Sequence, residues 1–144
     1  MGFQIKSKIN KNLEESVIHN DGEVLMKVNG SIIFKGDVII NHFWGLFLVM
    51  IEEFMKKEKT STCSYYQTNF CIKNGKRKDE LIFSIESDER RYRLNPINLN
   101  KKDFLEKTFD CGLLIYKELS KMDVDNEWDF DYLVKYIMEL KKKL

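Results

Sequence analysis

The sequence HFWGLFLVMIEEFMKK, residues 42–57, decides the fold, because it reads as one helix with apolar side chains around its first three turns. Such a helix must be covered on most of its sides, and we therefore expect it to be the central helix of the core. Asn41 precedes it and can cap its first turn with a side-chain oxygen. Gly45 lies inside this helix, where glycine lowers helix stability by about 1 kcal/mol relative to alanine. We expect this cost to be explained by a close approach of the helix to a strand at Gly45.

Strand patterns precede this helix. Residues 3–9 alternate apolar and polar side chains, which is typical of a half-buried strand. Residues 24–28 and 31–34 flank Asn29-Gly30, a pair that tolerates the positive φ angles of a two-residue hairpin. A second turn is expected at Lys35-Gly36-Asp37, before the apolar residues 38–40.

Strand patterns also follow the helix, and they predict a three-stranded meander. Its strands are expected over residues 63–72, 81–85 and 91–94, joined by polar segments at 74–79 and 87–90. Pro96 is expected to end the meander, because proline supplies no backbone donor to a sheet.

Two helices are expected near the C-terminus. Asn100 can cap a helix over residues 101–121, and a last helix spans about 128–142. The whole chain, residues 1–144, is thus predicted to be a single α+β domain. We expect an antiparallel sheet of about five to six strands, with the central apolar helix and the two C-terminal helices packed on it.

Composition limits the classes to which the chain can belong. With 24 Lys and Arg against 23 Asp and Glu, its 144 residues carry a formal charge of +1, so any electrostatic site must be local. The longest apolar run is too short for a membrane span, and the N-terminal residues lack the apolar core of a secretory signal. Three cysteines without CxxC spacing indicate reduced thiols. We therefore expect a cytoplasmic protein with no membrane partner.

No residue pattern marks an enzyme active site. Neither GxGxxG nor GxxxxGK[ST] occurs, and His19 and His42 have no partners at the spacing of a metal site. A Cys–His nucleophilic pair stays open, since such residues meet in space. Cys71 and Cys111 fall in apolar patterns, however, where cysteine acts as a small hydrophobe. We expect no enzyme, no cofactor and no metal.

An acidic, aromatic segment precedes and enters the last helix. It can be a loop followed by a helical turn whose carboxylates complement the helix dipole. It can also be a face that binds a basic partner, with an aromatic side chain as anchor. Its residues are Asp123, Asp125, Glu127, Trp128, Asp129, Asp131 and Tyr132.

All four arginines of the chain fall on the predicted meander. A salt-bridged, solvated hairpin explains them, because acidic residues alternate with the cations. The alternative is a small nucleic-acid-binding domain that contacts phosphates through these side chains. Nucleic acid is the less favoured partner, and the residues concerned are Arg77, Arg90, Arg91 and Arg93.

The chain resembles the small immunity proteins that bacteria encode beside polymorphic toxins. The resemblance lies in its size, in its lysine- and asparagine-rich composition and in its order of strands, helix, strands and helices. The resemblance implies a cytoplasmic protein that binds a cognate toxin domain and occludes its active site. Many such toxins are basic nucleases, so the carboxylates of residues 123–131 would face the toxin, with Trp128 or Tyr132 as anchor. A homodimer is compatible with this reading.

Overall fold

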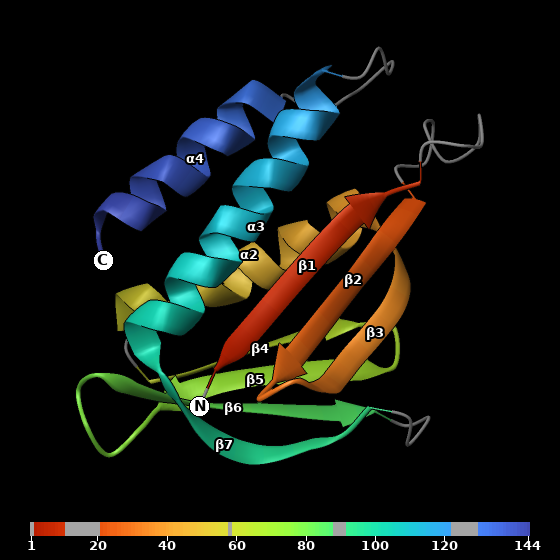
Figure 1. Ribbon diagram of the computed structural model, residues 1–144. Coiled ribbons are helices and arrows are strands. Elements are labelled where there is room, and N and C mark those ends of the chain that lie inside the picture. The colour runs from red at the N-terminus through yellow and green to blue at the C-terminus, as the bar shows by residue number, and fades with distance from the viewer. Residues whose placement is uncertain (1, 11–20, 58, 88–91, 122–129) are drawn as a thin grey trace.

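The computed structural model describes residues 2–10, 21–57, 59–87, 92–121 and 130–144, which form an α+β fold (Figure 1). The first strands and the helix that follows them are β1 (Phe3–Ile9), β2 (Asp21–Val28), β3 (Ser31–Ile39) and α2 (Ile40–Lys57). The second group of strands is β4 (Thr60–Tyr65), β5 (Thr68–Asn74), β6 (Glu80–Ser87) and β7 (Leu94–Asn100). Two helices, α3 (Lys101–Lys121) and α4 (Phe130–Lys142), complete the order.

The strands form two sheets, so the predicted single sheet of five to six strands is wrong. One sheet has the order β1-β2-β3 and the other β4-β5-β6-β7, and every neighbouring pair is antiparallel. The reason lies in the connection, because β3 passes directly into α2 at Ile40 and the chain re-enters a sheet only at Thr60. The α+β class and the antiparallel pairing are confirmed.

The hairpin at Asn29-Gly30 is confirmed. Asn29 and Gly30 have φ angles of 51° and 82°, as a two-residue turn of this kind requires. The turn expected at residues 35–37 is wrong, because β3 continues through it and Gly36 pairs with Val24. Gly36 serves packing instead: a Cβ at this position would lie 3.0 Å from Cζ of Phe34.

The strand predicted over residues 63–72 is two strands, β4 and β5, joined by a turn at Tyr66 and Gln67. Neither residue is a usual turn former, and so the pattern gave no sign of the turn. The predicted end of the sheet at Pro96 is also wrong, because Pro96 lies within β7. β7 is an edge strand whose register with β6 is irregular between Phe83 and Ile85, a position that tolerates proline.

The helix predicted over residues 101–121 is confirmed. Asn100 caps it, since its Oδ1 accepts a hydrogen bond of 2.8 Å from the backbone N–H of Asp103. The last helix is confirmed from Phe130 to Lys142, and its expected start at Trp128 lies outside the described residues.

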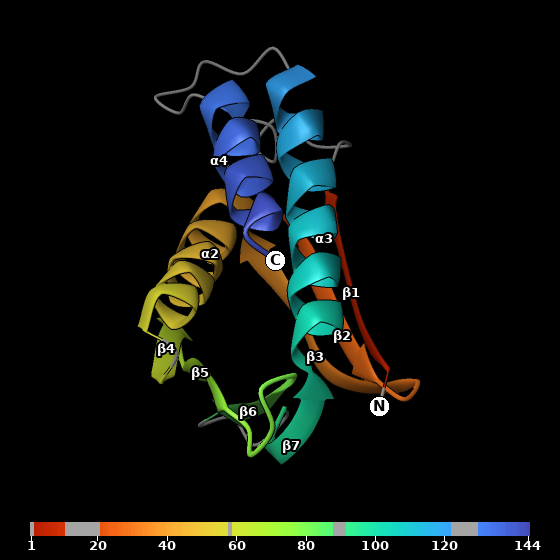
Figure 2. The same cartoon turned by 90° about the vertical axis from the view of Figure 1, so that its left-hand side faces the viewer.

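The helices surround one aromatic core that joins the two sheets. Figure 2 shows α2 over β4 and β5 on one side of the molecule, and α3 beside β1 with α4 alongside it on the other. The α2 and α3 helices meet where Gly112 admits Trp44, whose Nε1 donates to Ser7 Oγ at 3.2 Å. Phe43 and Phe70 meet edge-on in the same cluster, with 5.9 Å between the ring centroids, and both are fully buried.

Candidate protein-interaction surface

One stripe of α2 is open to solvent, although the apolar pattern predicted a helix covered on most sides. Phe43, Trp44 and Phe47 are fully buried, but Leu46 is 44% exposed and Val49 is 55% exposed. The two exposed side chains are three residues apart and therefore share a face of the helix. The helix is thus covered on most of its sides, as predicted, and this stripe is the part that stays open.

Gly45 opens into a hollow between α2 and the turn from β4 to β5. A Cβ at Gly45 would have nothing within 4 Å, so the predicted close approach to a strand is wrong. The hollow has a volume of about 570 Å³, and its lining is mainly apolar. We call this surface the apolar face; its residues are His42, Gly45, Leu46, Val49 and Tyr66.

Asn41 lies at the edge of the same hollow and is only 8% exposed. Because α2 begins at Ile40, Asn41 belongs to the first turn of the helix. Its buried Oδ1 makes no hydrogen bond with a described residue, so the predicted capping role is wrong.

Tyr66 is held in a backbone conformation that aromatic residues rarely adopt. Its φ angle is 53°, in the left-handed region that favours glycine, and its side chain is 75% exposed. The ring packs edge-on against Tyr65, with 4.7 Å between the ring centroids. Strained residues of this kind cluster at functional sites, where the surrounding structure holds them in place.

Tyr65 anchors this turn to the other sheet. Its hydroxyl accepts a hydrogen bond of 2.8 Å from the backbone N–H of Ile39, at the end of β3. Burial raises the pKa of Tyr65, so the hydroxyl keeps its proton at neutral pH. The backbone under Tyr66 is therefore fixed to both sheets.

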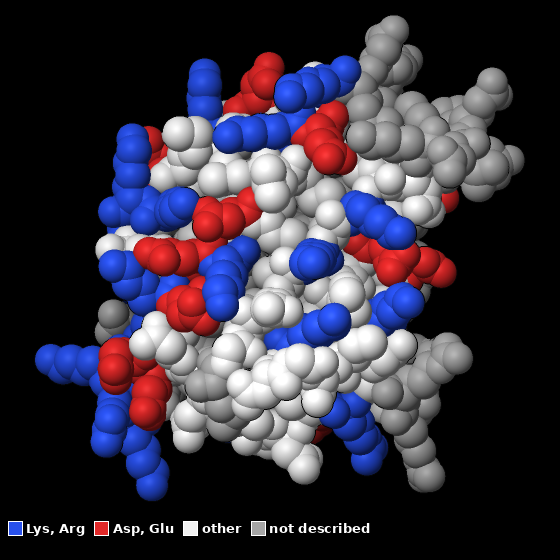
Figure 3. Space-filling model, in the orientation of Figure 1, with Lys and Arg blue, Asp and Glu red and all other residues white. Residues whose placement is uncertain are grey.

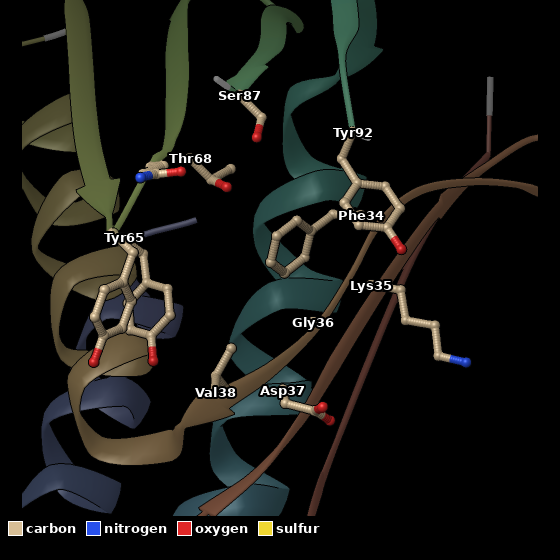
Figure 4. A pocket seen from close by; sticks show the side chains of 11 residues that line it. Phe34, Lys35, Gly36, Asp37, Val38, Tyr65, Thr68, Ser87 and Tyr92 are labelled. Atoms are coloured by element: carbon tan, nitrogen blue, oxygen red, sulfur yellow. The ribbon is translucent and has the colours of Figure 1, made fainter. Parts of the chain in front are cut away.

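A second hollow, of about 550 Å³, lies on the other side of Tyr65 and Tyr66 (Figure 4). One wall is β3 with Lys35, Gly36 and Asp37, and Thr68 and Ser87 stand on the opposite side. The ring of Phe34 points into the space and meets Tyr92 edge-on, with 5.7 Å between centroids. We call this space the β3 slot.

The thiols of half-buried Cys63 and buried Cys111 are not poised for nucleophilic chemistry. Burial raises the pKa of Cys63 and of Cys111 to about 12, so both remain protonated at neutral pH. In the part of the chain that the structure describes, no group of three or more His, Cys, Asp or Glu side chains could hold a metal ion. Neither Cys63 nor Cys111 is therefore an activated nucleophile.

Most of the predicted acidic, aromatic segment lies outside the described residues. Asp131 and Tyr132 are described, and both are exposed in the first turn of α4. The residues not described are Asp123, Asp125, Glu127, Trp128 and Asp129.

Two of the four arginines are described, and the structure does not bring them together. Arg77 lies in the connection from β5 to β6, whereas Arg93 precedes β7, whose Leu94 pairs with Ile85 near the other end of β6. Arg90 and Arg91 lie outside the described residues.

Charges alternate on the helical side of the molecule. On the face in Figure 3, blue and red side chains are interspersed over α3 and α4. Pairs such as Lys107 with Asp103, at 3.3 Å, and Lys102 with Glu106, at 3.9 Å, account for this pattern. Such exposed pairs contribute little to stability.

The residue pattern of α2 held a signal for the apolar face. His42, Leu46, Val49 and Glu53 follow one another at helical spacing, and the two polar residues at its ends mark this stripe as the solvent-facing one. The strained turn at Tyr66 had no comparable signal, because its residues read as a continuous strand.

Comparison of the chain with protein-family models, with curated proteins and with solved structures gives no match. Among the described residues, no helix combines the length and the apolar character needed to cross a membrane.

Proposed function

We propose that this chain is a protein-binding module of the immunity class, which binds and inhibits a cognate bacterial toxin domain in the cytoplasm. The observation that carries the proposal is the apolar face, where Leu46, Val49 and Tyr66 are exposed together around one hollow. Single exposed apolar residues are ordinary, but a group of them around a hollow is typical of an interaction site.

The backbone of this face favours specific binding. Leu46 and Val49 are fixed on a helix whose opposite side is buried in the core. Tyr66 is fixed by its turn and by Tyr65, and tyrosine is among the residues that contribute most to interfaces. A surface that is already ordered loses less conformational entropy on binding.

A protein that inhibits a toxin by covering its active site needs a binding surface and no catalytic group of its own. The protonated thiols of Cys63 and Cys111 agree with such a role. The acidic residues 123–131 would supply attraction to a basic toxin, which raises the rate of association. The apolar face would then supply most of the affinity.

The test is a growth assay with the protein encoded beside this chain. We expect its expression alone to arrest growth and co-expression of the chain to restore it. Leu46→Asp should abolish protection, because loss of an interface hot spot costs at least about 2 kcal/mol, or roughly thirtyfold in affinity. Leu114→Asp is the matched control, since Leu114 is 68% exposed on α3, outside the apolar face.

Three results would contradict the proposal. The neighbouring protein could be harmless, or Leu46→Asp could protect as well as the unaltered chain. Light scattering could also show a dimer of the isolated chain that Leu46→Asp dissociates, in which case the apolar face joins two copies.

A further inference from the structure

Among the described residues, no strand pairs with the outer edge of β3, and this edge opens into the β3 slot. We propose that this edge, at Lys35 and Asp37, binds an extended segment of the partner protein as an added antiparallel strand. The inference rests on the proposed function, since it names how part of the partner is bound.

Two hydrogen bonds fix which backbone groups of β3 face the slot. The Asp21 carbonyl accepts from Asn10 N at 2.9 Å, so this residue of β2 bonds toward β1. Ile39 pairs with Asp21 across the ladder, and its backbone N–H points away from β2 and donates to the hydroxyl of Tyr65 at 2.8 Å. Because backbone groups alternate along an antiparallel strand, those of Lys35 and Asp37 also point away from β2. No other described residue bonds to them.

Two other edge positions of this three-stranded sheet are already covered. The N–H of Ile39 is taken by Tyr65, which closes the end of the slot. At the opposite edge of this sheet, α3 lies against β1. Unpaired backbone groups on an exposed edge are the usual template for strand addition.

The slot has room and a suitable floor for such a segment. Its volume of about 550 Å³ lies within the range of ligand-binding pockets. Gly36 presents no side chain there, and the nearly buried Phe34 and Val38 supply apolar surface on either side of it. A residue opposite Gly36 would therefore be apolar.

The charges on the edge define the rest of the segment. Lys35 and Asp37 are both exposed and two residues apart, so their side chains lie on the same face of β3. An antiparallel segment would place a basic residue opposite Asp37 and, two residues later, an acidic residue opposite Lys35. The segment is thus of the form basic–apolar–acidic.

A second copy of β3 fits these charges but not the space. Antiparallel pairing of two β3 strands about Gly36 would place Lys35 opposite Asp37 twice. Ile33 of the second copy would then lie opposite Ile39, where Tyr65 already occupies the backbone donor. A short segment ends before this point and avoids the overlap.

The experiment uses the full ¹⁵N-labelled chain and two blocked pentapeptides, TKVET and TEVKT. With TKVET we expect the amide signals of Lys35 and Asp37 to shift in NMR spectra. TEVKT should bind roughly five times more weakly, because both cross-strand charge pairs are reversed. The double variant K35D/D37K should reverse this preference.

Asp37→Pro gives a second test, because it removes an edge donor that makes no bond to β2. It should abolish binding of TKVET while the remaining amide spectrum is retained. Shifts confined to the apolar face, equal binding of both peptides or an unchanged preference in K35D/D37K would overturn the inference. The peptides need no toxin, so this result is independent of the growth assay: failure here with rescue there refutes only the β3 edge.

Discussion

Replacement of Gly45 by alanine tests whether the apolar face is open. Glycine in a helix interior is less stable than alanine by about 1 kcal/mol. A Cβ at Gly45 would meet nothing within 4 Å, so no clash offsets this gain. We expect Gly45→Ala to raise the free energy of unfolding by about 1 kcal/mol and the melting temperature by about 4 °C. The added methyl group also occupies the hollow beside Leu46, so binding of the partner should weaken.

Gly112→Ala is the matched control, because it makes the same change in another helix. There a Cβ would lie 3.3 Å from Cδ1 of Ile137 and 3.3 Å from Cζ3 of Trp44, and both side chains are fully buried. Crowding of a packed core costs about 1–3 kcal/mol, which outweighs the helical gain. Urea unfolding followed by circular dichroism measures both variants. Equal or lower stability of Gly45→Ala would refute the reasoning, since it would mean that this side of α2 is covered.

Two further predictions concern the buried polar groups. Tyr65→Phe removes the acceptor of the 2.8 Å hydrogen bond from Ile39 N and should lower the free energy of unfolding by about 1–2 kcal/mol; an unchanged urea midpoint would show that Tyr65 does not hold β3. Stability should also fall as the pH rises from about 9 to about 12, because the thiols of Cys63 and Cys111 ionise near pH 9 when unfolded but only near 12 when folded. The free energy of unfolding should fall by about 1.4 kcal/mol per pH unit for each thiol. The C63A/C111A variant should therefore show a flatter profile of urea midpoint against pH. A profile identical to that of the unaltered chain would contradict the raised pKa of the two thiols.

Local signals in the sequence predicted local structure well. Asn29-Gly30 specified its hairpin, because few other pairs adopt two positive φ angles. Asn100 specified the start of α3, because its side chain bonds the free N–H of Asp103. Both depend on residues close together in the chain.

The arrangement of the two sheets could not be predicted in this way. Whether β3 and β4 pair depends on how α2 packs between them, which is a property of the whole core. The turn at Tyr66 was hidden because surrounding contacts, including Tyr65, hold a conformation that the residue itself disfavours. These features follow from contacts between distant residues.

The candidate site was missed for a related reason. An apolar side chain that packs in the core and one that binds a partner look alike in sequence, so the apolar pattern of residues 42–57 predicted the central helix without singling out Leu46 and Val49 as exposed. In the sequence, only the polar residues His42 and Glu53, at helical spacing with Leu46 and Val49, distinguish the exposed stripe from the buried one. The acidic segment from Asp123 to Asp131, which the sequence favoured, remains a prediction.

Methyl NMR of the complex tests the central claim most directly. The chain would carry labelled methyl groups on leucine and valine and be titrated with an inactive form of the neighbouring toxin domain. The signals of Leu46 and Val49 should shift or broaden at one equivalent, while those of the still more exposed Leu114 stay in place. Shifts at Leu114 with none at Leu46 and Val49 would contradict the apolar face as the binding surface.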